Sequence, residues 1–207
     1  MLTDPSAHEA IRAAAATDRL LRAVDLGVPS SAMSRMEREG VVERIIPGVY
    51  VGTGQPQHVL VEAAAWSMRH PRAVAGLLTA ARFHGLTDAF AGGVWLFVAK
   101  GSSPPRSVVV PVHVIQTAPR YIAPELDEEN GIVSVRVHGV GVRVTVPDRT
   151  VLDLWRYPRR VAAEHALSAL RSRARADDFH LPAFARLGRR LGVWRRLEPV
   201  VQGLALR

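Results

Sequence analysis

The chain has 207 residues, 48% of them hydrophobic, and its 27 basic and 19 acidic side chains give a formal net charge of +8. The absence of cysteine excludes disulfides, thiolate metal sites and cysteine nucleophiles. Because no apolar run reaches roughly eighteen residues and no basic-then-apolar leader begins the chain, we expect a cytoplasmic protein without a membrane-spanning helix.

The first periodic segment begins at Thr17, a residue type that caps helices. Apolar residues then recur at helical spacing: Leu20, Leu21 and Val24. Gly27 permits a tight turn after them. The segment therefore predicts a short helix that ends in a turn.

A second helix is predicted from Ser30 or Ser31, either of which can cap it, to Gly40, which ends it. Met33 and Met36 fall on one face, which we expect to be buried. The opposite face presents hydroxyl and guanidinium groups, and these are our candidates for DNA contact: Ser30, Ser31, Ser34, Arg35 and Arg38.

Two short strands follow, Val41–Glu43 and Val49–Val51, joined by a turn at Pro47-Gly48. A helix, a turn, a second helix and a two-stranded wing are the parts of a winged helix-turn-helix. We assign residues 1–52 to this head, with Arg44 on the wing as a further DNA contact, and residues 53–207 to a body.

The body begins with two helical patterns, His58–Arg69 and Arg72–His84, separated by His70-Pro71 and expected to form a helical hairpin. His84 is expected at a helix C-terminus, where a partly charged ring complements the last carbonyl groups. Four valine-rich runs then predict a small mixed or antiparallel sheet: Val94–Ala99, Val108–Gln116, Ile132–His138 and Val142–Val146. In the third run Val133, Val135 and Val137 alternate with Ser134, Arg136 and His138, which predicts one buried and one exposed face.

From Asp148, expected as an N-cap, the chain is predicted to be helical. Three further helices follow, at Arg159–Arg175, Pro182–Arg190 and Val193–Leu206. Their arginines are spaced so that one basic surface can form, which suits a partner protein or nucleic acid, although ordinary helix solvation explains them equally well: Arg171, Arg173, Arg175, Arg189 and Arg190. The fold class is therefore α/β (α+β), with a basic helical tail.

The head, in its run from Gly27 to Gly40 and in the segment Glu43–Tyr50, resembles the AbiEi-type antitoxins of bacterial AbiE toxin-antitoxin systems, which are type IV-like. The segments Leu77–Leu86 and Val144–Trp155 and the arginine-rich tail resemble the same family, so the likeness covers nearly the whole chain. The resemblance implies an antitoxin that represses its own promoter and counteracts a co-encoded AbiEii-like nucleotidyltransferase toxin. Its implied partners are operator DNA and that toxin, with no membrane.

The head departs from what DNA binding requires, because residues 1–52 contain 6 arginines and 7 acidic side chains. Affinity for DNA comes largely from basic groups that neutralise phosphates. A near-neutral head therefore needs a homo-oligomer on DNA, or the tail, to bind well. A protein that binds the toxin without reading an operator is an alternative.

No phosphate-cradling glycine motif occurs, and Gly139-Val140-Gly141 is typical of a hairpin turn. We therefore expect no cofactor. The remaining alternative is an enzyme that modifies the toxin by phosphoryl transfer with ATP and a divalent metal, for which Asp148, Asp153 and Lys100 are the candidates. Each has a structural explanation too: Asp148 as a helix cap, Asp153 in an i,i+4 ion pair with Arg149, and Lys100 at a strand end.

Overall fold

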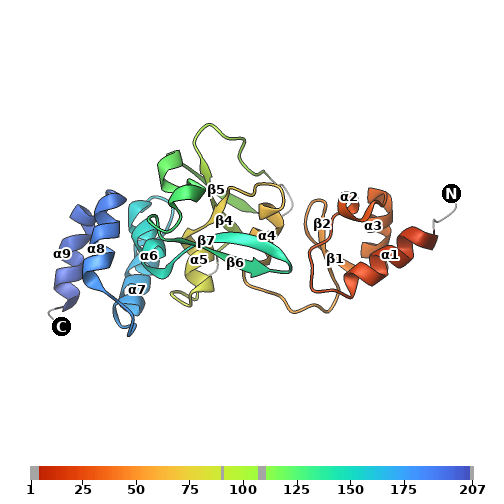
Figure 1. The fold of residues 1–207 in the computed structure, drawn as a ribbon. Coiled ribbons are helices and arrows are strands. Elements are labelled where there is room, and N and C mark those ends of the chain that lie inside the picture. Colours follow the sequence, from red (N-terminus) through yellow and green to blue (C-terminus); the bar gives the residue numbers. More distant parts are fainter. Residues whose placement is uncertain (1–4, 90, 107–110, 206–207) are drawn as a thin grey trace. The chain divides into compact units, whose positions relative to one another are not determined.

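The computed structural model describes residues 5–89, 91–106 and 111–205, and their helices and strands are labelled in Figure 1. The protein is of the mixed α/β class, with a two-stranded and a five-stranded sheet. The described residues form two compact units. The first comprises those of Met1–Pro71, Pro105–Pro111 and Val135–Val142, and the second those of Arg72–Pro104, Val112–Ser134 and Arg143–Arg207.

The first unit is built from small helices and a hairpin. In chain order these are α1 (Pro5–Ala15), α2 (Ala23–Leu26), α3 (Ser30–Arg38), β1 (Val42–Ile46), β2 (Val49–Gly52) and α4 (Val61–Ser67). Its core joins α1, α3 and the hairpin through Ile11, Ala15, Leu21, Met33, Met36, Val42 and Tyr50. Burial of Met33 and Met36, predicted from their spacing, is confirmed.

Strands β1 and β2 are antiparallel and lie where the sequence predicted two short strands, although β1 extends to Ile46, beyond its predicted end at Glu43. Gly48 has a φ of 78°, a left-handed conformation that costs glycine little, so the turn at Pro47-Gly48 is also confirmed. The close approach of α1 explains why β2 ends in a glycine, Gly52. A Cβ atom on Gly52 would lie 1.8 Å from the carbonyl oxygen of Ala15, so only glycine lets α1 end against this strand.

The predicted helix from Thr17 is wrong in extent, because only the four residues of α2 are helical. Leu21 instead forms a β-bridge with Tyr50, which ties this segment to the hairpin. The Thr17 hydroxyl donates to the Ala14 carbonyl at 2.6 Å and so lies at the end of α1, a helix that the sequence did not predict. Neither Ser30 nor Ser31 caps α3, because Pro29 occupies the N-cap position.

The large sheet has the order β5-β4-β3-β7-β6. Its strands are β3 (Val74–Ala75), β4 (Val94–Ala99), β5 (Val112–Thr117), β6 (Ile132–Val137) and β7 (Val140–Thr145). Strand β3 is antiparallel to β4 and parallel to β7, and β4 is parallel to β5, so the sheet is mixed. The start of the predicted second run, residues 108–110, lies outside the described residues.

The predicted helical hairpin is wrong, because β3 lies between its two helices. Helix α5 spans only Leu77–Phe83, and α4 and α5 belong to different compact units. His84 follows α5 as expected, but its ring lies against the carbonyl group of Thr145 in β7, which the sequence did not predict. Burial lowers the pKa of His84, and its Nε2 lies 2.7 Å from the Thr145 carbonyl oxygen, an arrangement that suits a neutral, donating ring.

The remaining helices are α6 (Pro147–Arg156), α7 (Ala163–Ala174), α8 (Leu181–Arg190) and α9 (Trp194–Ala205), with 3-10 turns η1 (Pro119–Tyr121) and η2 (Pro124–Leu126) before β6. They confirm the predicted helical tail, although Leu206 lies outside the described residues. None of the described helices is long and apolar enough to cross a membrane.

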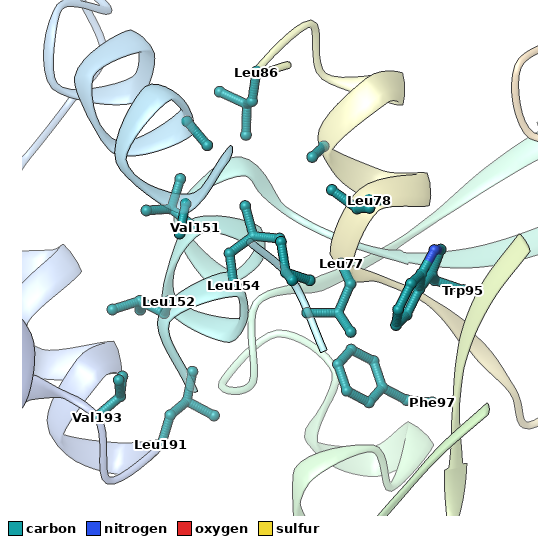
Figure 2. Close-up of a cluster of buried hydrophobic side chains, with 14 of the residues drawn as sticks. Leu77, Leu78, Leu86, Trp95, Phe97, Val151, Leu152, Leu154, Leu191 and Val193 are labelled. Carbon is teal, nitrogen blue, oxygen red and sulfur yellow. The ribbon is translucent and has the colours of Figure 1, made fainter. Parts of the chain in front are cut away.

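Helices α5 and α6 and strand β4 share the core of the second unit. Figure 2 shows Leu77 and Leu78 of α5 converging with Phe97 of β4 and with Val151 and Leu154 of α6. Leu77 and Leu154 are fully buried, and a buried side chain of this size stabilises a fold by about 1.5–3 kcal/mol. The core fixes the helix that carries Asp148 and Asp153.

Asp148 is not the N-cap of α6, which is Val146, because Pro147 already occupies the first turn. Its carboxylate instead accepts a hydrogen bond from Arg173 of α7 at 2.6 Å. The predicted Arg149–Asp153 pair is confirmed, with 2.6 Å between Arg149 Nε and Asp153 Oδ2, and both side chains are wholly buried. The predicted alternation along Ile132–His138 is wrong at two residues, since Val133 is 43% exposed and the His138 side chain is only 4% exposed.

Candidate nucleic-acid interface

Helix α3 is held in a fixed orientation by its two methionines. Met33 and Met36 are fully buried and belong to the same apolar cluster as Ile11 of α1 and Tyr50 of β2. Residues three apart lie on one face of a helix, so these anchors turn the other face of α3 toward solvent. In Figure 1 this helix lies beside α1 and α2 in the N-terminal unit.

The connection into α3 is a glycine turn. Gly27 has a φ of 65°, and its backbone N–H bonds to carbonyl groups of α2. The Val28 N–H donates to the Ala23 carbonyl at 3.1 Å, which closes the turn, and Pro29 then leads directly into α3. A left-handed residue at this point is the common way to end a helix, and it sets the direction of the next one.

The outward face of α3 carries all five residues predicted to contact DNA from this helix. Ser30, Ser31 and Arg38 are exposed, while Ser34 and Arg35 are half-buried. Ser34 Oγ donates to the Ser30 carbonyl at 3.3 Å, and Arg38 Nε donates to the Ser34 carbonyl at 3.4 Å. Both bonds run along the helix and leave the other guanidinium and hydroxyl groups facing solvent.

Acidic side chains neutralise the cations at either side of this face. The Arg44 guanidinium pairs with Glu37 and lies 5.4 Å from the centre of the Tyr50 ring. Arg12 of α1 pairs with Glu39 at 3.6 Å. Within the described residues neither Arg35 nor Arg38 forms an ion pair, so these two carry the uncompensated positive charge of α3.

This arrangement suits contact with a polyanion. Guanidinium groups donate to phosphate oxygens and to the acceptor edge of guanine, and serine hydroxyls bond to phosphates or to bases. An exposed helix face with both kinds of donor, held by buried anchors, can present these donors to phosphates or base edges. The adjoining β1–β2 hairpin adds Arg44, whose charge is already shared with Glu37.

No family model matches this sequence, and no curated protein matches it. The fold resembles a solved structure. The crystal structure of the RV2827C protein from Mycobacterium tuberculosis superposes with a TM-score of 0.60 over 88% of this chain and 71% of that one, at 16% sequence identity. At this identity the similarity shows a shared fold.

The arginines predicted to bind a partner differ in exposure and in the contacts that they already make within the protein. Arg171 and Arg175 are exposed on α7, whereas Arg173 is buried against Asp148 and Asp178 and serves to join α6 and α7. At the end of α8, Arg189 lies 5.7 Å from the ring of Trp194, and Arg190 pairs with Glu129 at 2.8 Å. Arg173 and Arg190 are thus already committed within the fold.

The three residues considered for phosphoryl transfer each have a structural partner. Asp148 accepts from Arg173, and Asp153 is buried against Arg149. Lys100 is exposed just after β4, where its backbone N–H donates to the Thr117 carbonyl at 2.8 Å. In the parts of the chain that the structure describes, no group of three or more histidine, cysteine or acidic side chains is placed to hold a metal ion.

Sequence reasoning missed the tie between the β6–β7 turn and the N-terminal segment. His138 Nδ1 contacts the Asp18 carboxylate, and the Leu20 N–H donates to the His138 carbonyl at 3.1 Å. His138 and Gly139 both have positive φ, 45° and 79°, as a two-residue hairpin turn requires. The glycines predicted a turn here, but nothing in the sequence names its partner.

Proposed function

We propose that this chain is an antitoxin of the AbiEi type, which represses its own operon by binding promoter DNA and neutralises a nucleotidyltransferase-type toxin. The observation that carries the DNA-binding part is the outward face of α3, with Ser30, Ser31, Ser34, Arg35 and Arg38, held by two buried methionines. The antitoxin part is supported by the sequence resemblance.

The order α2, glycine turn, α3 and β1–β2 hairpin supports the interpretation of this region as a winged helix-turn-helix. In that interpretation α3 is the recognition helix and the hairpin is the wing. The short α2 is the least regular part, because its first turn lacks a side-chain cap and Val24 is 75% exposed. The proposal therefore rests on α3 more than on α2.

Two copies are expected on the operator. One head presents few uncompensated cations, since Glu37 and Glu39 neutralise Arg44 and Arg12. A single recognition helix with so little charge binds weakly, whereas two heads on a palindromic site combine their contacts. We expect inverted repeats spaced by about one helical turn, on the order of ten base pairs.

The test is a mobility shift of the full chain on its own upstream DNA and on scrambled DNA of equal length. The double substitution Arg35→Ala/Arg38→Ala is expected to weaken binding to the upstream DNA at least about tenfold, because each lost contact to a base or phosphate costs roughly 1–3 kcal/mol. The folded state is checked by circular dichroism.

The matched control is Arg159→Ala/Arg160→Ala, which removes the same charge from exposed arginines of the second unit. It should leave the preference for the upstream DNA intact. If both double variants bind the upstream DNA like the unaltered protein, α3 is not the reading helix, and the DNA-binding proposal fails.

A second candidate function is a head that docks on a protein. It is favoured by Val24, whose side chain is 75% exposed on α2, and by the paired charges around α3. In that case Val24→Asp would weaken co-purification of the co-encoded toxin and leave DNA binding unaltered. The opposite pattern would favour operator binding by the head.

A further inference from the structure

A second group of arginines gathers around one tyrosine in the C-terminal unit, far along the chain from α3. Tyr121 ends η1, and Arg120 Nη2 donates to its hydroxyl at 3.1 Å. The Cζ atoms of Arg156 and Arg120 lie 4.2 and 4.8 Å from the centre of its ring. Arg149 Nη1 is 3.3 Å from its backbone carbonyl oxygen.

Positive charge exceeds negative charge in this cluster. Among the described residues, the three guanidinium groups around Tyr121 have one paired carboxylate, Asp153. Its Oδ2 accepts from Arg149 at 2.6 Å, and its Oδ1 lies 3.6 Å from Arg156 Nη1. The second separation is too long for a hydrogen bond. The neighbouring Arg143 adds no surplus, because it pairs with Asp127.

Besides this surplus of positive charge, the cluster contains guanidinium N–H donors without a hydrogen-bond partner. Arg149 Nη2 and Arg156 Nη1 are buried and have no hydrogen-bond partner among the described residues, and neither has Asp153 Oδ1, which lies 3.6 Å from Arg156 Nη1. Buried donors are rarely left unpaired, because an unpaired donor loses its hydration without compensation. The cluster therefore combines surplus positive charge with guanidinium donors that its carboxylate leaves incompletely paired.

The positive field also acts on the phenol. The hydrogen bond from Arg120 and then the charges of Arg156, Arg120 and Arg149 lower the pKa of Tyr121 against the opposing effect of burial. A field that favours a phenolate favours any oxyanion at the same place. Arg120 is exposed, and Tyr121 and Arg156 are half-buried, so solvent reaches the cluster.

We propose that Arg120, Tyr121 and Arg156 form a binding site for a phosphate group, with Arg149 and Asp153 holding Arg156 and Tyr121 in position. Forked guanidinium groups bind phosphate oxygens through paired, charge-assisted hydrogen bonds, and the phenol adds a donor. The phosphate belongs to a small phosphate ester or to the backbone of DNA. The site does not depend on DNA reading by α3.

The first arm of the test measures binding of inorganic phosphate and pyrophosphate to the full chain by titration calorimetry. Arg120→Ala should weaken binding about tenfold, the effect of losing one charge-assisted pair of hydrogen bonds. Tyr121→Phe, which keeps the ring between the arginines, should weaken it less. Arg160→Ala removes an equal charge from an exposed arginine of the same unit and should have no effect.

The second arm measures the salt dependence of binding to scrambled duplex DNA. If the phosphate is part of a DNA backbone, Arg120→Ala lowers the slope of log K against log salt by about one, and Arg160→Ala does not. Phosphate binding that responds to Arg120→Ala, with no change in this slope, assigns the site to a small phosphate ester. If Arg120→Ala acts like Arg160→Ala in both arms, the proposal is overturned, whatever Arg35 and Arg38 do.

Discussion

The ion pair between Arg149 and Asp153 is wholly buried in the second unit. Their i,i+4 spacing on one helix was enough to predict the ion pair. Their complete burial was not predictable, because the groups that surround them come from elsewhere in the chain, such as the Asn130 carbonyl, which accepts from Arg149 at 2.7 Å. A surface pair contributes little to stability, whereas a buried pair is costly to break.

Asp153→Asn is therefore expected to lower the free energy of unfolding by about 3–5 kcal/mol, since it leaves the Arg149 charge buried and unpaired. Urea denaturation at neutral pH measures the loss. The double variant Arg149→Met/Asp153→Leu, which removes both charges and keeps the volume, should lose less than Asp153→Asn alone. A single variant as stable as the unaltered protein would contradict a charged, buried pair.

Helix caps were the least predictable residues. Thr17, Ser30 and Asp148 all have side chains that cap helices well, yet Pro29 and Val146 hold the N-cap positions of α3 and α6. A serine, threonine or aspartate can cap a helix only where its own backbone is extended, just before the first helical residue. In α3 the proline itself is the extended N-cap residue, whereas in α6 Pro147 follows the extended N-cap residue Val146. Asp148 instead bonds to Arg173.

At the scale of elements, long and regular patterns were predictable and short ones were not. Strand β4 has the predicted bounds, Val94–Ala99. Its six apolar residues lie between a glycine and a lysine, which mark both ends of the strand in the sequence. Strand β3 has two residues, which is too few for any periodicity, and yet it pairs with both β4 and β7. Its place is fixed by its neighbours in the sheet. The sequence therefore predicted the buried face of α3, Met33 and Met36, and missed the centre of the sheet.

The contact between α1 and β2 gives a prediction for Gly52. Gly52→Ala would bring a Cβ within 1.8 Å of the Ala15 carbonyl oxygen, which is backbone and cannot rotate away. We expect a loss of about 2 kcal/mol or more in the stability of the first unit, as in other overpacked sites. Stability is measured by thermal denaturation, alongside a mobility shift that reports on α3.

The control for this variant is Gly203→Ala. Gly203 lies in α9, and a Cβ there would meet nothing within 4 Å. Replacing a free helical glycine by alanine should raise stability by about 0.5–1 kcal/mol. A destabilisation of similar size in both variants would mean that the contact at Ala15 is not the cause.

For the whole molecule, the division of charge along the chain is the most consequential property. Residues 149–207 contain 13 basic and 5 acidic side chains, whereas residues 1–148 contain 14 of each. All of the net charge of +8 therefore belongs to residues 149–207. Charge of this kind attracts polyanions without regard to sequence.

Binding to scrambled DNA is accordingly expected to depend steeply on salt and to be nearly unaffected by Arg35→Ala/Arg38→Ala. Arg171→Ala/Arg175→Ala, which removes two exposed cations of α7, should lower the slope of log K against log salt by up to about two. Fluorescence anisotropy over a salt series measures both. A slope that responds to the α3 variant alone would show that the tail arginines do not contact phosphates.

The β6–β7 hairpin starts in the second unit, and its turn belongs to the first. The Leu20–His138 backbone bond and the Asp18–His138 contact therefore join two stretches of the first unit that are more than a hundred residues apart in the chain. No single cleavage of the polypeptide separates one complete unit from the other. A fragment ending at Pro71 lacks the turn that bonds to Leu20, so expressing the first unit alone requires joining its other segments, Val135–Val142 among them, back onto it.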